Sequence, residues 1–146
     1  MYSFKTWIRL FRVQQWYKNV VVFIALLFSQ NLFDPRLFFL CVVAFFSLSF
    51  VSSANYIIND IKDRYKDAKH PLRKERPIAS GKVSLKNAKT ISGLSLIVGL
   101  ILAALLNPLF LILIVMLFLL MQVYTFYLKK FFIEMNICLN PKIKIQ

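Results

Sequence analysis

The chain has 146 residues, of which 59% are hydrophobic and 16% aromatic, and this composition excludes an ordinary soluble domain of the same size. Its formal net charge of +13 would suggest a nucleic-acid partner in a soluble protein. Because the charges are confined to segments between long apolar runs, we instead expect an integral membrane protein with anionic lipid and phosphate partners and no nucleic acid. Cys41 and Cys138 have no metal-ligand spacing and are expected to be inert thiols.

The N-terminal segment, residues 2–15, is amphipathic. Lys5, Arg9 and Arg12 fall on one side of a helical projection, and bulky apolar residues fall on another. This pattern predicts a helix that lies in the membrane interface with its basic face against lipid headgroups. No small-residue cleavage site follows the next apolar run, which argues against a signal peptide.

Four apolar runs follow that are long enough to cross a bilayer, which predicts an all-α protein with four transmembrane helices. Asp34 and Pro35 are expected to start the second helix, Ser84 to cap the third, and Asn107 with Pro108 to form the connector before the fourth. Small serines of the second run should allow close helix packing; they are Ser47, Ser49, Ser52 and Ser53. The expected spans are residues 16–33, 37–58, 88–106 and 109–128.

Lysine and arginine are distributed unevenly among the connecting segments. The segment up to Lys18 has four of them and residues 60–89 have ten, whereas the two opposite connectors contain only Arg36. Two further lysines follow the last span. The positive-inside rule therefore predicts that the N-terminus, the polar loop at residues 59–87 and the C-terminal tail are cytoplasmic, in a protein of the cytoplasmic (inner) membrane.

The polar stretch joins a series of oxygen-bearing side chains to a cluster of cations. Asn55, Asn59, Asp63 and Asp67 are spaced by four, so they share a broad face of one helix, and Asp60 follows Asn59 directly. Carboxylates one turn apart repel each other, and Mg²⁺, which takes hard oxygen ligands, would remove this repulsion. A solvated loop of mixed charge is the alternative. The cations that follow make the pattern typical of a diphosphate site; they are Lys69, His70, Arg73, Lys74 and Arg76.

The order of residues in this stretch resembles a known family. Residues 59–67 read N-D-x-x-D-x-x-x-D directly after an apolar span, which resembles the first aspartate-rich motif of the UbiA prenyltransferase superfamily. His70 with Pro71, and then R-P-I-A-S-G at residues 76–81, are similar to the decaprenyl-phosphate phosphoribosyltransferase branch. Two positions depart from the pattern of that branch, since Arg73 replaces a usual lysine and Ala68 a common arginine.

Two further segments extend the resemblance. Residues 12–19, RVQQWYKN, resemble the start of the first helix in this branch, which implies that Lys18 and Asn19 face the site. The alternative is that Lys18 only extends to the membrane surface. Residues 124–129, YTFYLK, resemble the end of the fourth helix, which implies that Tyr124 positions the substrate and that Lys129 helps to hold phosphates. An interfacial belt with a cytoplasmic lysine is the alternative there.

The resemblance implies a fold of nine membrane helices around a cavity, in which two aspartate-rich motifs hold Mg²⁺ and a diphosphate between them. It covers residues 1–130, as the N-terminal part of such a bundle, and residues 131–146 form an atypical polar tail. Because the chain supplies one of the two motifs, we expect it to be poorly active alone unless it associates with itself or with a second half-chain.

The implied activity is the Mg²⁺-dependent transfer of 5-phosphoribose from phosphoribosyl diphosphate to a polyprenyl phosphate, such as decaprenyl phosphate, in the membrane. Asp60, Asp63 and Asp67 are the implied catalytic, metal-binding carboxylates, with Asn59 as a further ligand. His70 has the alternative role of ending the helix. The implied positioning residues are Asn55, Asn59, His70 and Tyr124, and the implied phosphate-binding residues are Lys18, Asn19, Arg73, Lys74, Arg76 and Lys129.

Three other functions fit parts of the sequence. An aromatic prenyltransferase of quinone or haem biosynthesis would use the same scaffold with an allylic diphosphate, but the His70-Pro71 pair argues against it. A small four-span transporter would need an ionisable residue within a span, and none of the four apolar runs has one at its middle. An inactive remnant or small membrane protein is the third alternative, and it is favoured by the short polar tail.

Overall fold

The computed structural model describes residues 3–129, and every regular element in this range is helical. The predicted all-α fold is thereby confirmed for this part of the chain, and the predicted polar tail at 131–146 lies outside the described residues. In chain order the elements are α1 (Phe4–Phe11), the 3₁₀ helix η1 (Val13–Val21), α2 (Val22–Phe28), α3 (Pro35–Lys69), α4 (Leu85–Leu106), α5 (Pro108–Val123) and the π-helical turn η2 (Tyr124–Leu128).

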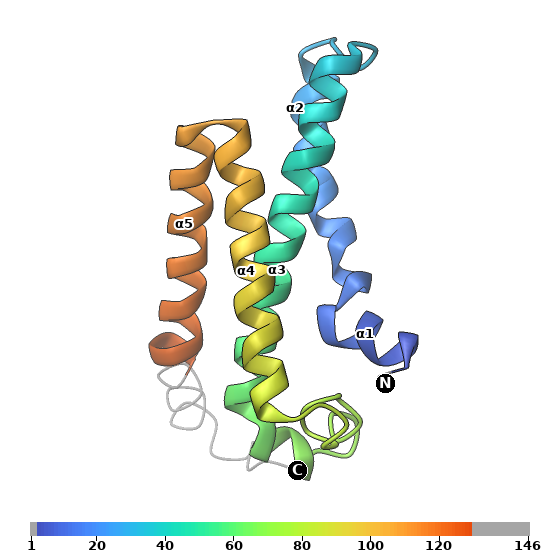
Figure 1. The fold of residues 1–146 in the computed structure, drawn as a ribbon, viewed down its shortest axis with the longest axis vertical. Helices are drawn as coiled ribbons and strands as arrows, with labels where there is room; N and C mark the ends of the chain where they lie inside the picture. The colour runs from blue at the N-terminus through green and yellow to red at the C-terminus, as the bar shows by residue number, and fades with distance from the viewer. Residues whose placement is uncertain (1–2, 130–146) are drawn as a thin grey trace, which may run out of the picture.

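The longest helix, α3, forms the axis of the bundle. Its 35 residues correspond to a length of about 52 Å, and it packs against η1 and α2, against α4 and against α5. Figure 1 shows two helical hairpins, α2 with α3 and α4 with α5, whose turns lie toward the same end of the molecule. At the other end lie α1, the loop of residues 70–84 and the last turns of α3, which carry the aspartates.

Within residues 3–129, three helices are long and apolar enough to cross a membrane, namely α3, α4 and the continuous helix Pro108–Leu128. They contain the last three predicted spans. The first apolar helical segment differs from the prediction, because it runs from Val13 to Phe28 and not to residue 33. It ends there because Gln30 takes a left-handed conformation with a φ of 59°. A fourth crossing by this segment, and a bundle of nine helices, therefore stay predictions.

The N-terminal helix is also shorter than predicted. It ends at Phe11 because Arg12 adopts a left-handed conformation, with φ 50° and ψ 45°. The chain then continues as η1, which packs along α3. This bend turns Arg12 toward α3, although the sequence pattern placed it on a face against lipid headgroups.

The helix starts predicted at Asp34 and Ser84 are confirmed, and the connector predicted at Asn107 with Pro108 also caps a helix. The side chains of Asp34, Ser84 and Asn107 each accept a hydrogen bond from a backbone N–H in the first turn of the following helix. Pro35 and Pro108 occupy the first helical positions, where a backbone N–H has no partner within the helix. These starts were predictable because a cap is made by residues adjacent in sequence.

Serine hydroxyls and one glycine allow α3 and α4 to approach closely. The Ser47 hydroxyl donates to the Gly99 carbonyl at 2.8 Å, and the Ser95 hydroxyl donates to the Phe50 carbonyl at 3.0 Å. Because each hydroxyl is paired with the backbone of the neighbouring helix, no unpaired polar group is left in the apolar interior at these positions. The prediction that serines of α3 pack against other helices is confirmed for those that are fully buried, Ser47, Ser49 and Ser53.

Replacing Gly99 by alanine is expected to destabilise this helix pair by about 1–3 kcal/mol, the usual effect of overpacking. A Cβ atom at this position would lie 2.6 Å from Cγ2 of Val51 and 3.0 Å from the carbonyl oxygen of Ser47. Gly93 provides a control in the same helix, because a Cβ there meets nothing within 4 Å. Thermal unfolding in detergent, followed by circular dichroism, should show a lower midpoint for Gly99→Ala and not for Gly93→Ala. Equal midpoints would contradict the close approach.

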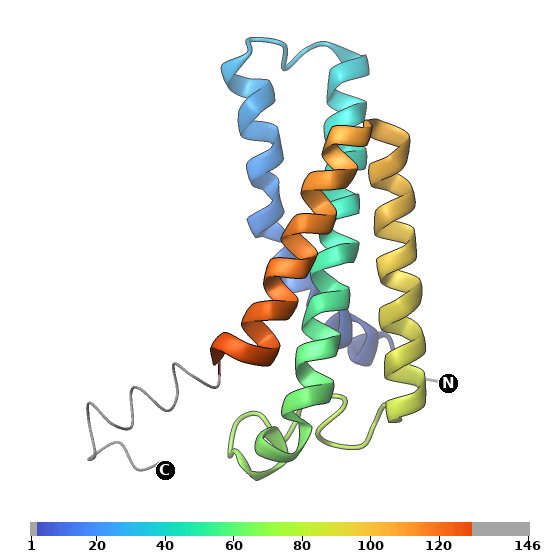
Figure 2. The ribbon, with the colours of Figure 1, turned by 90° about the vertical axis from the view of Figure 1, so that its left-hand side faces the viewer.

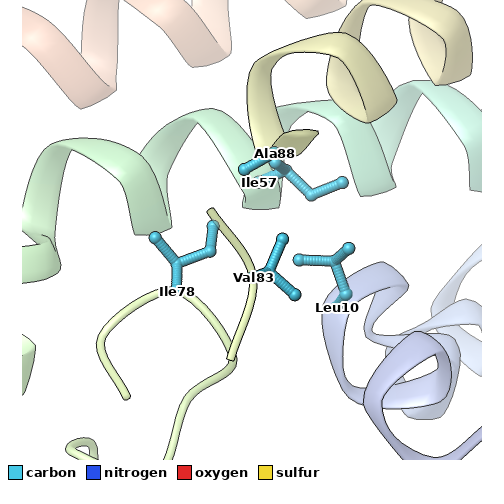
Figure 3. Packing of buried hydrophobic residues seen from close by; sticks show 5 residues of the cluster. All are labelled: Leu10, Ile57, Ile78, Val83 and Ala88. Carbon is cyan, nitrogen blue, oxygen red and sulfur yellow. The ribbon is translucent and has the colours of Figure 1, made fainter. Parts of the chain in front are cut away.

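A small apolar core fixes the loop of residues 70–84 to the helices. Figure 3 shows its five side chains, which come from α1, α3, the loop and the start of α4. All five are buried, with exposed fractions between 0% and 6%. Because the loop contributes two of these side chains, it is held against α1 and α3 at the end of the bundle where the aspartates lie. The five residues are Leu10, Ile57, Ile78, Val83 and Ala88.

Candidate functional site

The three aspartates predicted to be catalytic lie on the last turns of α3, and all three are buried. The exposed fractions of Asp60, Asp63 and Asp67 are 4%, 7% and 1%. A buried carboxylate is stable only when it is paired and hydrogen-bonded. In this structure each of the three is paired with a basic side chain that comes from a different part of the chain.

Arg76 bridges two of these aspartates. Its Nη1 atom lies 3.1 Å from Oδ1 of Asp60 and 2.6 Å from Oδ2 of Asp67. Arg73 approaches Asp67 more distantly, at 3.9 Å, and its side chain is 55% exposed. The structure thus brings Arg76, and more distantly Arg73, beside the aspartates, and their role in phosphate binding stays a prediction.

The loop presents Arg76 because the residues that follow it are anchored. Pro77 and Ile78 are buried, and the backbone N–H of Val83 donates to the carbonyl of Pro77 at 2.9 Å. Gly81 turns the chain with a φ of 74°, a conformation that favours glycine. The R-P-I-A-S-G string thus encodes a turn with a buried centre, and the guanidinium that precedes it is directed to α3.

Arg12 lies in the site, although the amphipathic pattern predicted that it faces lipid headgroups. Its Nη2 atom donates to Oδ1 of Asp60 at 2.5 Å, and its guanidinium carbon lies 4.8 Å from the centre of the Tyr56 ring. The left-handed turn at Arg12 makes this contact possible, and nothing in the amphipathic pattern predicts such a turn. The one signal in the sequence was that the segment resembling the family begins at this residue.

Lys129 reaches the aspartates from the end of the last helix. Its ammonium group pairs with Asp63 and donates to Oδ1 of Asn59 at 3.3 Å. One turn earlier on α3, Oδ1 of Asn55 accepts a hydrogen bond from Gln122 at 2.5 Å. Three members of the face predicted from the spacing by four, Asn55, Asn59 and Asp63, therefore lie against the last helix, and Lys129 is brought into the site.

The predicted metal ligands fall into two pairs. Asp60 and Asp67 share one cation, Arg76, whereas Asn59 and Asp63 share another, Lys129. Within residues 3–129 no group of three or more acidic, histidine or cysteine side chains is arranged to hold one metal ion. Mg²⁺ commonly uses only one or two protein carboxylates together with water and substrate phosphate. Asp60 and Asp67, which both accept a hydrogen bond from Nη1 of Arg76, fit that mode of binding.

A cavity of about 350 Å³ opens beside Asp60, between α1, the start of η1 and the basic loop. Three guanidinium groups line it, those of Arg9, Arg12 and Arg76. Two carboxylates also line it, Asp60 and Glu75, so the lining carries a net positive charge. An anion of the size of a phosphate group would meet complementary charge there.

Several predicted site residues are not brought to the aspartates. Asn19 donates to the Ser49 hydroxyl at 3.0 Å, more than two helical turns from Asp60 along α3. Lys18 is exposed and lies 6.0 Å from the ring centre of its neighbour Tyr17. Tyr124 is half exposed on η2.

Two residues of the basic loop also lack contact with the carboxylates. Lys74 is exposed. His70 caps α3, and its Nδ1 atom accepts the N–H of Leu72 at 3.2 Å, which supports the alternative that this residue ends the helix.

Residues 19–139 match the UbiA prenyltransferase family. Among its relatives, the chain is 34% identical over 83 residues to the uncharacterized protein y4nM of Sinorhizobium fredii. It is 38% identical over 76 residues to a decaprenyl-phosphate phosphoribosyltransferase of Corynebacterium glutamicum, and 33% identical over 84 residues to nodulation protein NoeC of Azorhizobium caulinodans. The matched parts make up 57%, 51% and 56% of this chain.

The same matched parts make up 16%, 23% and 26% of the three relatives, so the chain spans about a quarter of their length at most. The family match, in contrast, covers most of this chain and includes every aspartate and arginine of the site except Arg9 and Arg12. The helical membrane fold and the aspartate-rich motif agree with it. The chain belongs to the UbiA prenyltransferase family.

Proposed function

We propose that the chain forms the donor-binding part of a Mg²⁺-dependent phosphoribosyltransferase, which transfers 5-phosphoribose from phosphoribosyl diphosphate to a polyprenyl phosphate. One observation carries the proposal: three buried aspartates lie in direct contact with Arg12, Arg76 and Lys129. The site thus offers carboxylates for a metal next to cations for phosphate. The similarity to a decaprenyl-phosphate phosphoribosyltransferase supports the choice of donor and acceptor.

In this proposal the basic side chains exchange partners when the donor binds. Arg76, now held by two carboxylates, turns its guanidinium to the diphosphate, and Lys129 leaves Asp63 in the same way. Exposed cations of the loop, Arg73 and Lys74, then meet the 5-phosphate at the other end of the ribose. In this exchange, charge-assisted hydrogen bonds to carboxylates are replaced by charge-assisted hydrogen bonds to phosphate oxygens, so the cations stay paired.

The carboxylates released by this exchange suit Mg²⁺. Asp60 and Asp67 would hold the ion as a pair, and Asp63 with Asn59 provides a second pair of oxygen ligands. When bound, Mg²⁺ supplies positive charge that stabilises the leaving diphosphate. The protein's own contribution is to keep the three carboxylates at the end of α3, where they are shielded from water and lie beside the packed loop.

The reaction is a substitution at the anomeric carbon of the ribose. The bond from this carbon to the diphosphate oxygen breaks, and the electron pair leaves with the diphosphate. A phosphate oxygen of the polyprenyl phosphate forms the new bond to the same carbon. Because this oxygen is already anionic, the site needs no general base, and the charge on the leaving group is the main barrier that the cations must lower.

The acceptor would reach the site from the membrane. The aspartates lie on α3 just beyond its apolar part, so the phosphate of a membrane lipid lies at their level. With the cytoplasmic orientation predicted from the lysine and arginine distribution, the water-soluble donor enters the same site from the cytoplasm. We accordingly propose a location in the cytoplasmic (inner) membrane.

Competition between donors tests this function against the aromatic prenyltransferase alternative. Labelled phosphoribosyl diphosphate is bound to the full chain in detergent with Mg²⁺ and is displaced by unlabelled phosphoribosyl diphosphate or by geranyl diphosphate. We expect geranyl diphosphate to compete at least about tenfold more weakly, because it lacks the 5-phosphate that Arg73 and Lys74 would bind. Tighter competition by geranyl diphosphate would instead identify an allylic donor.

A further inference from the structure

A second hollow lies on the side of α3 that faces away from the aspartates. It has a volume of about 390 Å³, and its floor is formed by Ile58, Ile61 and Tyr65. In a helix these three positions are rotated by roughly 100–160° from Asp60. Figure 2 shows why the space is open: α4 and α5 are close at their connecting turn and separate toward the other end, with α3 between them. We call this hollow the α4–α5 groove.

Three cations line the α4–α5 groove, and among residues 3–129 no acidic side chain lines it. Lys62 lies 4.5 Å from the centre of the Phe126 ring and donates to the carbonyl of Thr125, which leaves two of its N–H donors for a ligand. Arg64 lies 4.3 Å from the ring centre of Tyr65 and donates to its hydroxyl at 2.8 Å. Lys89 is exposed and forms no ion pair within residues 3–129.

The position of the groove along the helices indicates the kind of ligand. Ile58 ends the apolar part of α3, Lys89 lies at the start of α4, and Phe126 lies at the end of the last helix. The groove is therefore at the level where the apolar helices meet the polar loop, and both apolar and cationic side chains line it. A soluble anion would leave the apolar floor uncovered, and a neutral lipid would leave the three cations unpaired.

We propose that the α4–α5 groove binds one anionic phospholipid of the surrounding bilayer. Its phosphate contacts Lys62, Arg64 and Lys89, and an acyl chain lies over Ile58 and Ile61 between the diverging helices. Basic pockets between transmembrane helices on the cytoplasmic side bind acidic headgroups in this way. Lys62 also contacts the backbone of η2, which is followed by Lys129 of the aspartate site. A lipid bound in the groove therefore stabilises the helix end that places Lys129 beside Asp63.

Native mass spectrometry of the full chain in a nonionic detergent tests this inference with phosphatidylglycerol and phosphatidylcholine as probes. The wild-type chain should retain phosphatidylglycerol with at least about tenfold preference. Replacing the three groove cations by glutamine should weaken this binding by about 100-fold, since each contributes about fivefold near a membrane surface. The matched control replaces Lys66, Lys69 and Lys86, which lie on the same two helices, are exposed and do not line the groove.

The control variant should bind phosphatidylglycerol within about twofold of wild type. Equal losses in the two variants, or wild-type binding by the groove variant, would overturn the proposal. Displacement of phosphatidylglycerol by an equimolar short-chain polyprenyl phosphate would also overturn it, because the groove would then be an acceptor site. If the triple variant does not fold, Lys89→Gln serves alone: it breaks no ion pair within residues 3–129 and should weaken binding about fivefold.

Discussion

Replacing Arg76 by methionine is expected to lower the free energy of unfolding by about 3 kcal/mol. The substitution keeps an apolar stem but removes the one guanidinium that bridges Asp60 and Asp67, whose side chains are 5% and 2% exposed. Breaking a buried ion pair by removing one partner typically has an effect of about 3–5 kcal/mol. The low end applies because Arg12 still pairs with Asp60, and because the Arg76 side chain is 28% exposed.

The matched control for Arg76→Met is Arg73→Met, in the same loop and near the same carboxylate. The Arg73 side chain is 55% exposed and lies 3.9 Å from Asp67, so its loss should change stability by less than about 1 kcal/mol. Unfolding in mixed micelles, followed by far-ultraviolet circular dichroism, gives both values. Equal changes in the free energy of unfolding for the two substitutions would contradict a larger contribution from the buried bridge.

The second large effect is expected from the carboxylates themselves. Asp63→Asn with Asp67→Asn should weaken Mg²⁺-dependent binding of phosphoribosyl diphosphate by at least about 100-fold. Replacing a group that only orients a metal ligand already lowers metal affinity by about 10–100-fold, so the loss of two ligands should exceed that. Isothermal titration calorimetry of the full chain in detergent measures the change. This expectation rests on the proposed function.

Asp34→Asn is the control for the double substitution. Asp34 caps α3 at the far end of the bundle, and asparagine caps a helix as well as aspartate does. Its replacement removes one negative charge without touching the site, and it should leave donor affinity unchanged within about twofold. A loss of affinity in this variant as large as in the double variant would indicate a general effect of charge or folding.

Local patterns in the sequence predicted the helices and the centre of the site. Helix starts follow from a capping residue, with a proline beside it at Asp34 and Asn107 and without one at Ser84. The end of α3 at Lys69 followed from Pro71, since the helical conformation is disfavoured for a residue that precedes proline. The spacing by four placed Asp63 and Asp67 on one face of α3, and the structure finds both buried, together with Asp60.

The pairing of charges in the site could not be derived from the sequence. Which cation meets which carboxylate depends on contacts between segments far apart in the chain, such as Arg12 with Asp60 and Lys129 with Asp63. The contact of Arg12 needs a left-handed residue that no local pattern required. Asn19 was predicted to face the site, but its amide instead donates a hydrogen bond to the Ser49 hydroxyl on α3.

The most direct test of a metal-dependent diphosphate site is the affinity of the wild-type chain for phosphoribosyl diphosphate with Mg²⁺ and with excess chelator. We expect at least about tenfold tighter binding with Mg²⁺, since the ion neutralises repulsion between the diphosphate and the aspartates. Equal affinity in both conditions, with unchanged affinity in the Asp63→Asn, Asp67→Asn variant, would contradict a metal-dependent diphosphate site. The aspartates would then serve only to anchor Arg12, Arg76 and Lys129 at the end of α3.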